Sequence, residues 1–262
     1  WKSVILRCKT SMKTCYPRYT DWNTTSNITE YMKQAIFILI LLIGLSSIHA
    51  QEITIGAPNY DSIAIIIRDS TSSYYYPRLF SRLLQYDTTL NVEEYKILYY
   101  GYTFQPEYEP YWRSPYDDKL AKYYQKPDLN EQDQDSLIFY ALQSISTNPF
   151  DLRQLNSLAY VYHLKGDEET TYRISHRFQG IIAAIMSTGD GMTCQSAFHV
   201  ISTGHEYVVL NLFQFQFESQ LLTSDFCDLL RVKKDQRGID GIYFSIKRIW
   251  DTNAAKMKTM NK

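Results

Sequence analysis

Two histidines and a glutamate in the last third of the chain have side chains suited to metal or acid–base chemistry: His199, His205 and Glu206. Two imidazoles and a carboxylate can bind zinc. The zinc-protease pattern His-Glu-x-x-His is incomplete, because Val209 stands where the second histidine belongs. On one helix, a spacing of six residues corresponds to a rotation of about 600°. The side chains of His199 and His205 would therefore point in different directions unless Gly204 bends the chain. Two hypotheses follow: a hydrolase or metal-binding site, or a small polar cluster that joins the last helix to a sheet.

Tyrosine is the most unusual feature of the composition, with thirteen tyrosines between Tyr74 and Tyr124. The ring joins a large apolar face to a polar tip, which suits both sugar stacking and protein interfaces. The candidate binding residues are Tyr95, Tyr99, Tyr102, Tyr108 and Trp112. The alternative is that Tyr95, Tyr99 and Tyr102, which recur at helical spacing, belong to the core.

Other catalytic signatures are missing from the sequence. It contains no Gly-x-Ser-x-Gly elbow, phosphate-binding glycine loop or dinucleotide fingerprint. The acidic stretch 128–135 suggests calcium, but it lacks the glycine and the closing glutamate at the required offsets. We interpret it as a solvated linker that caps the next helix. The sequence therefore favours a non-catalytic protein with no cofactor and no metal, although paired carboxylates leave no local signature.

A leader is predicted over residues 32–50. A short basic start at Met32 is followed by the apolar run Ile36–Leu45 and by small residues up to Ala50. This pattern predicts a signal peptide with cleavage after Ala50. The apolar run is too short for a membrane span, which needs about 20 apolar residues. Residues 1–31 precede a complete signal, so we interpret them as an upstream non-native extension. We expect a periplasmic or secreted product without a stable membrane span after cleavage.

Charge and cysteine content limit the possible partners. The first 50 residues hold six of the 27 basic and two of the 28 acidic residues, so the remainder carries a net charge of −5. An acidic chain lacks the basic stripes that nucleic acids require. Cys194 and Cys227 remain after cleavage, and they form either one disulfide in an oxidising compartment or two buried free thiols.

Hydrophobic periodicity predicts a mostly helical chain. A helix capped by Asn91 carries Tyr102, and further helices are expected over 78–86, 115–125, 136–146, 152–165 and 168–186. The Ile-rich run 62–68 fits a helix or a strand. We expect a last helix near 193–203.

After that point the period changes to two. Alternation around 213–218, 230–233 and 242–247 predicts three short strands. Turn residues between the last two suggest an antiparallel meander. Residues 254–262 are expected to form a frayed tail.

One segment resembles the first helix and turn of a tetratricopeptide repeat. The matching residues are Leu155, Leu158, Ala159, Tyr162 and Gly166-Asp167. The following helix departs from the pattern at Thr171, Ser175 and Phe178. The resemblance therefore implies helix-pair packing more than a peptide groove.

A second resemblance covers nearly all of 59–246. The stretches that carry it are 74–80, 87–90, 94–95, 98–102, 148–153, 164–170, 199–202, 205–207 and 241–244. In this order they resemble a secreted Bacteroides-type family catalogued as domain of unknown function 4919. The resemblance implies membership but no activity.

These observations predict an α+β fold of mostly α-helical hairpins, partly tetratricopeptide-like, with a small C-terminal antiparallel β-meander. The single mature domain would comprise a helical part, 51–190, and a part with the last helix, meander and tail, 191–262. We expect a non-catalytic interaction or scaffold domain of the cell envelope whose partner is another envelope protein or a peptide. The alternatives are a hydrolase or metal-binding protein that uses His199, His205 and Glu206, and a carbohydrate-binding module that uses exposed tyrosines.

Overall fold

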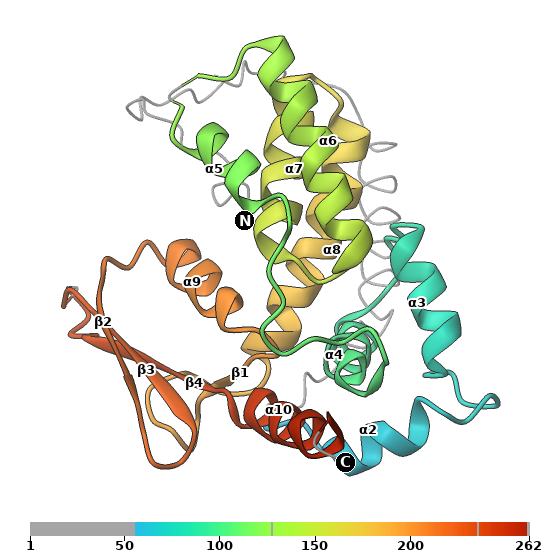
Figure 1. Cartoon of the computed structure of the whole chain (residues 1–262), viewed down its shortest axis with the longest axis vertical. Helices are drawn as coiled ribbons and strands as arrows, with labels where there is room; N and C mark the ends of the chain where they lie inside the picture. Colours follow the sequence, from blue (N-terminus) through green and yellow to red (C-terminus); the bar gives the residue numbers. More distant parts are fainter. Residues whose placement is uncertain (1–55, 127, 235, 261–262) are drawn as a thin grey trace, which may run out of the picture. The chain divides into compact units, whose positions relative to one another are not determined.

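The computed structural model describes residues 56–126, 128–234 and 236–260 (Figure 1). The predicted extension over 1–31 and the predicted signal peptide over 32–50 lie outside the described residues. Within the described part, none of the helices is both long and apolar enough to cross a membrane.

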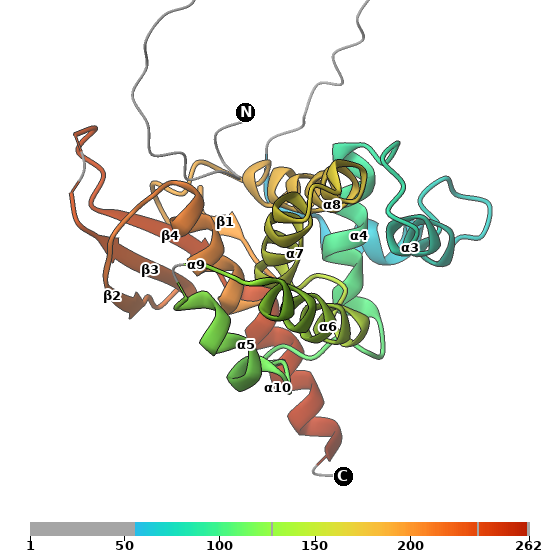
Figure 2. The ribbon, with the colours of Figure 1, turned by 90° about the horizontal axis from the view of Figure 1, so that it is seen from above.

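The first part of the described chain is helical. Its elements are α2 (Tyr60–Ile66), α3 (Tyr76–Leu84), α4 (Val92–Gly101), the 3-10 turn η1 (Tyr102–Phe104), α5 (Asp117–Tyr124), α6 (Glu131–Thr147), α7 (Leu152–Leu164) and α8 (Glu168–Met186). Helices α6, α7 and α8 pack in succession, while α4 packs on α8 and α5 on α6 (Figures 1 and 2). The Ile-rich run that fitted a helix or a strand forms α2.

Side-chain caps explain where several helices begin. The Asn91 side chain accepts a hydrogen bond from the Glu94 backbone N–H, and Glu94 accepts one from the Asn91 N–H, both at 2.9 Å. This capping box satisfies two backbone donors at the start of α4. Asn130 caps α6 in the same manner through the Asp133 N–H at 2.9 Å. Our interpretation of 128–135 as a linker is therefore wrong for its second half, which forms the first turn of α6.

The C-terminal part contains a four-stranded mixed sheet in the order β1-β4-β3-β2. The strands are β1 (Phe198–His199), β2 (Phe217–Leu222), β3 (Cys227–Val232) and β4 (Gly241–Ser245). Strands β2, β3 and β4 form the expected antiparallel meander, but β1 adds to it in parallel with β4. The fold class is thus α+β, as predicted, with a mixed rather than a purely antiparallel sheet.

Three predicted segments of this part are wrong. No helix forms at 193–203. The last helix before the meander is instead α9 (Thr203–Leu212), which lies over one face of the sheet (Figures 1 and 2). The alternating phenylalanines begin a strand only at Phe217, because Phe213 is the C-cap of α9. Residues 254–260 of the expected tail instead belong to a further helix, α10 (Lys247–Met260), and residues 261–262 lie outside the described residues.

Helix α10 is attached to the helical part by Arg248. Its guanidinium carbon lies 4.6 Å from the Tyr60 ring centre and 4.2 Å from that of Phe104. Its Nε donates a hydrogen bond to the Thr103 hydroxyl at 2.8 Å. A cation stacked between two rings is worth up to about 2 kcal/mol when desolvated, and this contact helps to explain why a polar C-terminal segment is ordered as a helix.

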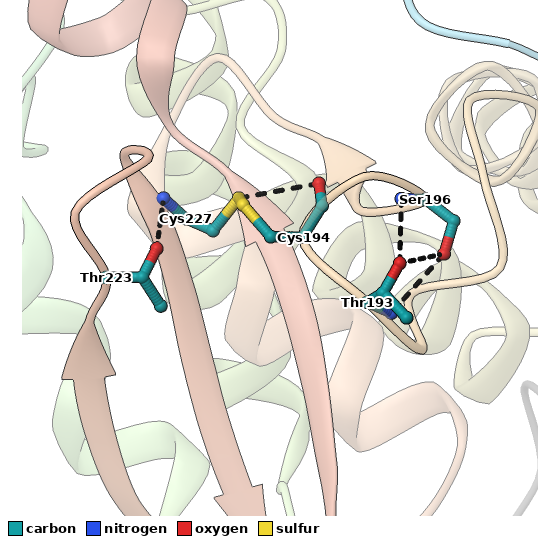
Figure 3. Close-up of a disulfide and its surroundings, with 5 residues drawn as sticks. All are labelled: Thr193, Cys194, Ser196, Thr223 and Cys227. Atoms are coloured by element: carbon teal, nitrogen blue, oxygen red, sulfur yellow. Dashed lines mark hydrogen bonds between the residues drawn. A yellow bond between two sulfur atoms is a disulfide. The ribbon is translucent and has the colours of Figure 1, made fainter.

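A disulfide joins Cys194, in the loop after α8, to Cys227, the first residue of β3 (Figure 3). Of the two alternatives that the sequence left open, the structure has the bridge. It ties the loop that precedes β1 to the centre of the sheet.

Candidate functional site

A cleft of about 380 Å³ lies among the described residues. We use "the cleft" for this hollow throughout. Its walls come from the loop 110–114 with Asp117 of α5, from the α6–α7 turn with the first residues of α7, and from the first two turns of α9. These three segments are far apart in sequence, so the cleft exists only in the folded chain.

The loop that forms one wall is held from two sides. The Tyr108 hydroxyl donates to the Ile201 carbonyl at 2.8 Å. On the other side, the Lys256 ammonium of α10 donates to the Tyr108 carbonyl and to the Glu109 carboxylate, both at 2.6 Å. The loop is therefore fixed against both the segment before α9 and the C-terminal helix.

The start of α7 supplies a second wall. Asp151 accepts a hydrogen bond from the Gln154 backbone N–H at 3.3 Å and one from the Ser144 hydroxyl at 2.8 Å. Burial nonetheless raises the pKa of the Asp151 carboxyl. The buried Gln154 side chain accepts a hydrogen bond from the Tyr124 hydroxyl at 2.7 Å. Both polar side chains are thus already engaged within the protein.

His205 closes the floor of the cleft at the start of α9. Its Nδ1 lies 2.6 Å from the Tyr99 hydroxyl, and this hydroxyl also accepts the Ile201 N–H at 3.2 Å. The Phe150 backbone hydrogen-bonds to the same ring. Burial lowers the pKa of His205 to about 4, so the imidazole is neutral at physiological pH. This network joins α4, the α6–α7 turn and α9.

Besides small polar residues, the cleft is lined by Arg113, Arg153, Asp117, Asp151 and three aromatic rings. Neither Arg113 nor Arg153 forms an ion pair within residues 56–126, 128–234 and 236–260. Tyr111 is 53% exposed, and Trp112 and Tyr207 are half-buried along the same walls. The cleft therefore presents two arginines and two aspartates beside aromatic surface.

A second hollow, of about 310 Å³, lies beside β3 and β4. Its Arg231 guanidinium lies 3.8 Å from the Asp240 carboxylate. We consider the cleft the better candidate site, because it combines charged side chains with the exposed Tyr111 ring.

Glu206 follows His205 in the sequence but has a different environment. Its side chain is fully buried, and neither carboxylate oxygen has a hydrogen-bond partner of normal geometry among the described residues. Burial and the facing Asp228 carboxyl raise the pKa of Glu206 well above its usual range. Asp228, on β3, accepts a hydrogen bond from the Gln220 side chain at 2.6 Å. The two acids thus form a buried pair between α9 and the sheet.

His199 contacts residues other than Glu206 and Asp228. Its backbone N–H donates to the Thr188 hydroxyl at 2.9 Å, and its carbonyl accepts from the Tyr100 hydroxyl at 3.0 Å. Burial lowers the pKa of the His199 imidazole to about 4. Within the part of the chain that the structure describes, no three side chains of His, Cys, Asp or Glu are grouped so as to hold a metal ion.

Most of the tyrosines proposed for binding are in the core. Tyr95, Tyr99, Tyr102 and Tyr108 are each at most 5% exposed, which supports the alternative for those at helical spacing. Of the proposed binding residues, Trp112 lines the cleft. Sequence reasoning missed Tyr111, Arg113 and Arg153. The contiguous Tyr111-Trp112-Arg113, in a proline-bounded loop, was a signal that could have indicated them.

Comparison with known proteins gives a family and no activity. A family model described as a domain of unknown function (DUF4919) matches residues 61–255, a range that contains every wall of the cleft. No curated protein matches the chain, and no solved structure matches it.

Proposed function

The chain belongs to the DUF4919 family of unknown function, and from its geometry we propose that it is an exported, non-catalytic binding domain whose ligand site is the cleft. The observation that carries the proposal is the cleft itself. It is concave, it has the volume of a small-molecule site, and it gathers unpaired charge and aromatic surface from three segments. Its fixed loop and helix ends offer a preformed surface, which reduces the entropic cost of binding.

The hydrogen bonds that the acid–base groups already make within the protein favour a binding role over catalysis. The Tyr99 hydroxyl engages His205 Nδ1, and the Phe150 backbone also interacts with this ring. The neighbouring Ser202 hydroxyl accepts the Gly204 N–H at 3.3 Å as the cap of α9. A serine nucleophile needs a base within hydrogen-bond reach, and within the described residues the Ser202 hydroxyl is engaged in capping α9 and not by the His205 ring.

The buried acids also argue against a hydrolase. Glycosidases need two carboxyl groups that flank the substrate. Glu206 and Asp228 are 0% and 3% exposed and do not line the cleft, whereas Asp117 and Asp151 do. We therefore consider a hydrolase that uses Glu206 weaker than the binding hypothesis.

Export is the second part of the proposal, and two observations support it. The sequence predicts a leader over 32–50, and the described chain contains the Cys194–Cys227 disulfide. Disulfides persist in oxidising compartments and are rare in the cytosol. Cell fractionation tests this part: we expect the processed protein outside the cytosol, and a cytosolic, unprocessed product would contradict it.

Binding is tested by a thermal-shift screen of the full chain against oligosaccharides, short peptides and organic acids. Tyr111→Ala removes exposed aromatic surface from the cleft, whereas Tyr172→Ala removes a ring that is 60% exposed on α8. We expect ligands that stabilise the parent chain to lose their effect with Tyr111→Ala and to keep it with Tyr172→Ala. Ligands that respond equally to both variants would place binding outside the cleft.

A further inference from the structure

We propose that β2 is a docking edge for a second copy of this chain, whose own β2 pairs with it in the antiparallel direction. The proposal is independent of the cleft. Strand β2 is the last in the sheet order β1-β4-β3-β2, at the outer margin of the sheet in Figure 1. Among the described residues β2 pairs with β3 alone, so no strand of this part of the chain covers its other edge.

The backbone groups along this open edge follow from the pairing with β3. The Thr223 N–H donates to the Cys227 carbonyl at 2.8 Å, so the backbone of Thr223 points towards β3. Successive residues of a strand point their backbone groups to opposite sides. The N–H and C=O groups of Leu222 and Gln220 therefore point away from β3, where they can bond to another strand.

The second half of β2 lacks the features that usually protect a strand edge. Natural edges are blocked by lysine, proline, bulges or a covering segment. In β2 the irregular register and the charged Glu218 are confined to the start of the strand. Residues 219–222 carry no charge and no proline, and Leu221 and Leu222 are 58% and 46% exposed. This half of the strand is therefore suited to pairing with another strand.

A second copy can pair with this half of β2 about a two-fold axis at Leu221. Gln220 of each copy then lies opposite Leu222 of the other, so the outward-facing backbone groups meet in two hydrogen-bonded pairs. The Gln220 side chain points towards α9, because it accepts a hydrogen bond from the Tyr207 hydroxyl at 2.9 Å. Leu221 consequently points to the other face of the sheet, where the two Leu221 side chains cover each other.

The charges at the two ends of β2 are compatible with this reversal. The exposed Asp225 lies in the turn after β2, and the segment 233–237 after β3 contains three basic residues and one acidic residue. The Lys233 N–H donates to the Gln216 carbonyl at 2.8 Å, so this basic segment begins beside the start of β2. Antiparallel pairing brings Asp225 of each copy to the end of the sheet where the basic segment of the other begins, and Glu218 has no acidic residue opposite it.

A second copy fits this edge better than a foreign peptide. Peptides that add a strand to a sheet obtain affinity from backbone hydrogen bonds and specificity from pockets for their side chains. No residue of β2 lines either the cleft or the hollow beside β3 and β4. The edge therefore offers a peptide no pocket in either hollow, whereas a second copy supplies its own Leu221 and the complementary charges.

Analytical ultracentrifugation of the full chain tests the association. A single strand pair is a small contact, so we expect a reversible dimer with a dissociation constant of roughly 1–100 µM. Leu221→Lys replaces the apolar pair with two ammonium groups that face each other, and it should weaken the association about tenfold. Ile65→Lys is the matched control, because Ile65 is a 71% exposed aliphatic residue of α2. This control should dimerise like the parent chain.

Cysteine cross-linking tests the register. Leu221→Cys places two thiols opposite each other at the axis, where the Cα atoms of a non-hydrogen-bonded pair lie about 4.5 Å apart, within the range of a disulfide. Ser219→Cys is the matched control on the same strand, because its two thiols are offset by about four residues, or roughly 13 Å. On oxidation we expect a covalent dimer of Leu221→Cys and none of Ser219→Cys.

Three results would overturn the proposal. They are a parent chain that stays monomeric up to about 500 µM, a dimer that Leu221→Lys leaves unchanged, and cross-linking of Leu221→Cys no greater than that of Ser219→Cys. Because Leu221 is exposed, the melting curves of its variants should match that of the parent chain. If Leu221→Lys does not fold, the comparison of the two cysteine variants decides.

Discussion

The Glu206 carboxyl is unfavourably placed, because it is fully buried and faces another acid. Its pKa in the folded chain is raised above the unfolded value of about 4.3. Because the folded-state pKa is raised, the protonated form of Glu206 contributes its full stabilisation at pH values below the unfolded pKa. That stability is lost as the pH rises through the folded pKa. The pair with Asp228 therefore destabilises the protein on the alkaline side.

We predict that Glu206→Gln raises the free energy of unfolding by about 1–3 kcal/mol at pH 8, because the amide is neutral when buried, whereas the carboxyl must either bind a proton or bury its charge. At pH 4 the difference should be small. Urea unfolding at both pH values measures it, with the exposed Glu218→Gln as control. Equal destabilisation at both pH values would show that Glu206 is held by a specific partner instead.

The Tyr99 hydroxyl is a second residue whose contribution can be isolated. It hydrogen-bonds to His205 and accepts the Ile201 N–H, and its side chain is 0% exposed. We predict that Tyr99→Phe lowers the free energy of unfolding at pH 7 by about 1–3 kcal/mol, because two buried polar groups lose their partner. The control Tyr172→Phe removes an exposed hydroxyl and should change stability little. A neutral Tyr99→Phe would mean that water replaces the hydroxyl.

His205 adds a pH dependence of the opposite sign. Its folded pKa of about 4 lies below the usual value of 6.5. The stability that the neutral ring supplies is present above the unfolded pKa and is lost as the pH falls through 6.5 towards 4. Between about pH 4.3 and 6.5 the contributions of His205 and Glu206 therefore oppose each other, and above about pH 6.5 only the loss from Glu206 continues.

At the scale of elements, the packing of α4 on α8 depends on Gly180. A glycine within a helix costs about 1 kcal/mol relative to alanine, so its presence in the middle of α8 needs an explanation. A Cβ at Gly180 would overlap the Tyr95 ring of α4. The absent side chain is therefore what allows the two helices to approach.

We predict that Gly180→Ala destabilises the protein by about 1–3 kcal/mol through overpacking, although alanine is the better helix former. Gly204→Ala in α9 is the matched control. Its Cβ would meet nothing closer than the Ser202 hydroxyl at 3.6 Å, so it should be neutral or slightly stabilising. Thermal unfolding of both variants provides the comparison, and a stabilised Gly180→Ala would show that Tyr95 can move.

At the scale of the whole molecule, the disulfide joins the loop after α8 to the sheet. Cys194 and Cys227 are 33 residues apart in sequence, and a loop of this length restricts the unfolded chain. In the chain-entropy model such a bridge contributes about 3–4 kcal/mol. The bridge therefore makes unfolding of the loop before β1 and of the start of β3 less favourable.

We predict that a reducing agent lowers the free energy of unfolding of the native protein by about 3–4 kcal/mol. The double variant Cys194→Ala and Cys227→Ala should show no response to the reductant. Urea unfolding with and without reductant measures both. Alkylation of the native protein before any reduction would reveal free thiols, which would contradict the bridge and weaken the case for export.

The sequence alone determined where most helices lie, because their signals are local. Asn91, Asp151 and Asp167 each accept a hydrogen bond from the backbone three residues later, so a short window contains the whole cap. The fold class and the family also followed from the sequence. Helix α10 was missed because its order depends on packing, with Ile249 fully buried and Arg248 between two rings.

Only the tertiary structure decided which of the tyrosines are buried and which segments form the cleft. Helical spacing places Tyr95, Tyr99 and Tyr102 on one face of a helix. It does not determine whether that face is exposed to water or packs against α8 and α9. Likewise, β1 pairs in parallel with β4 across more than 40 residues, with Phe198 opposite Phe244. Contacts between segments so far apart depend on how whole elements pack, and no local pattern of residue types records that arrangement.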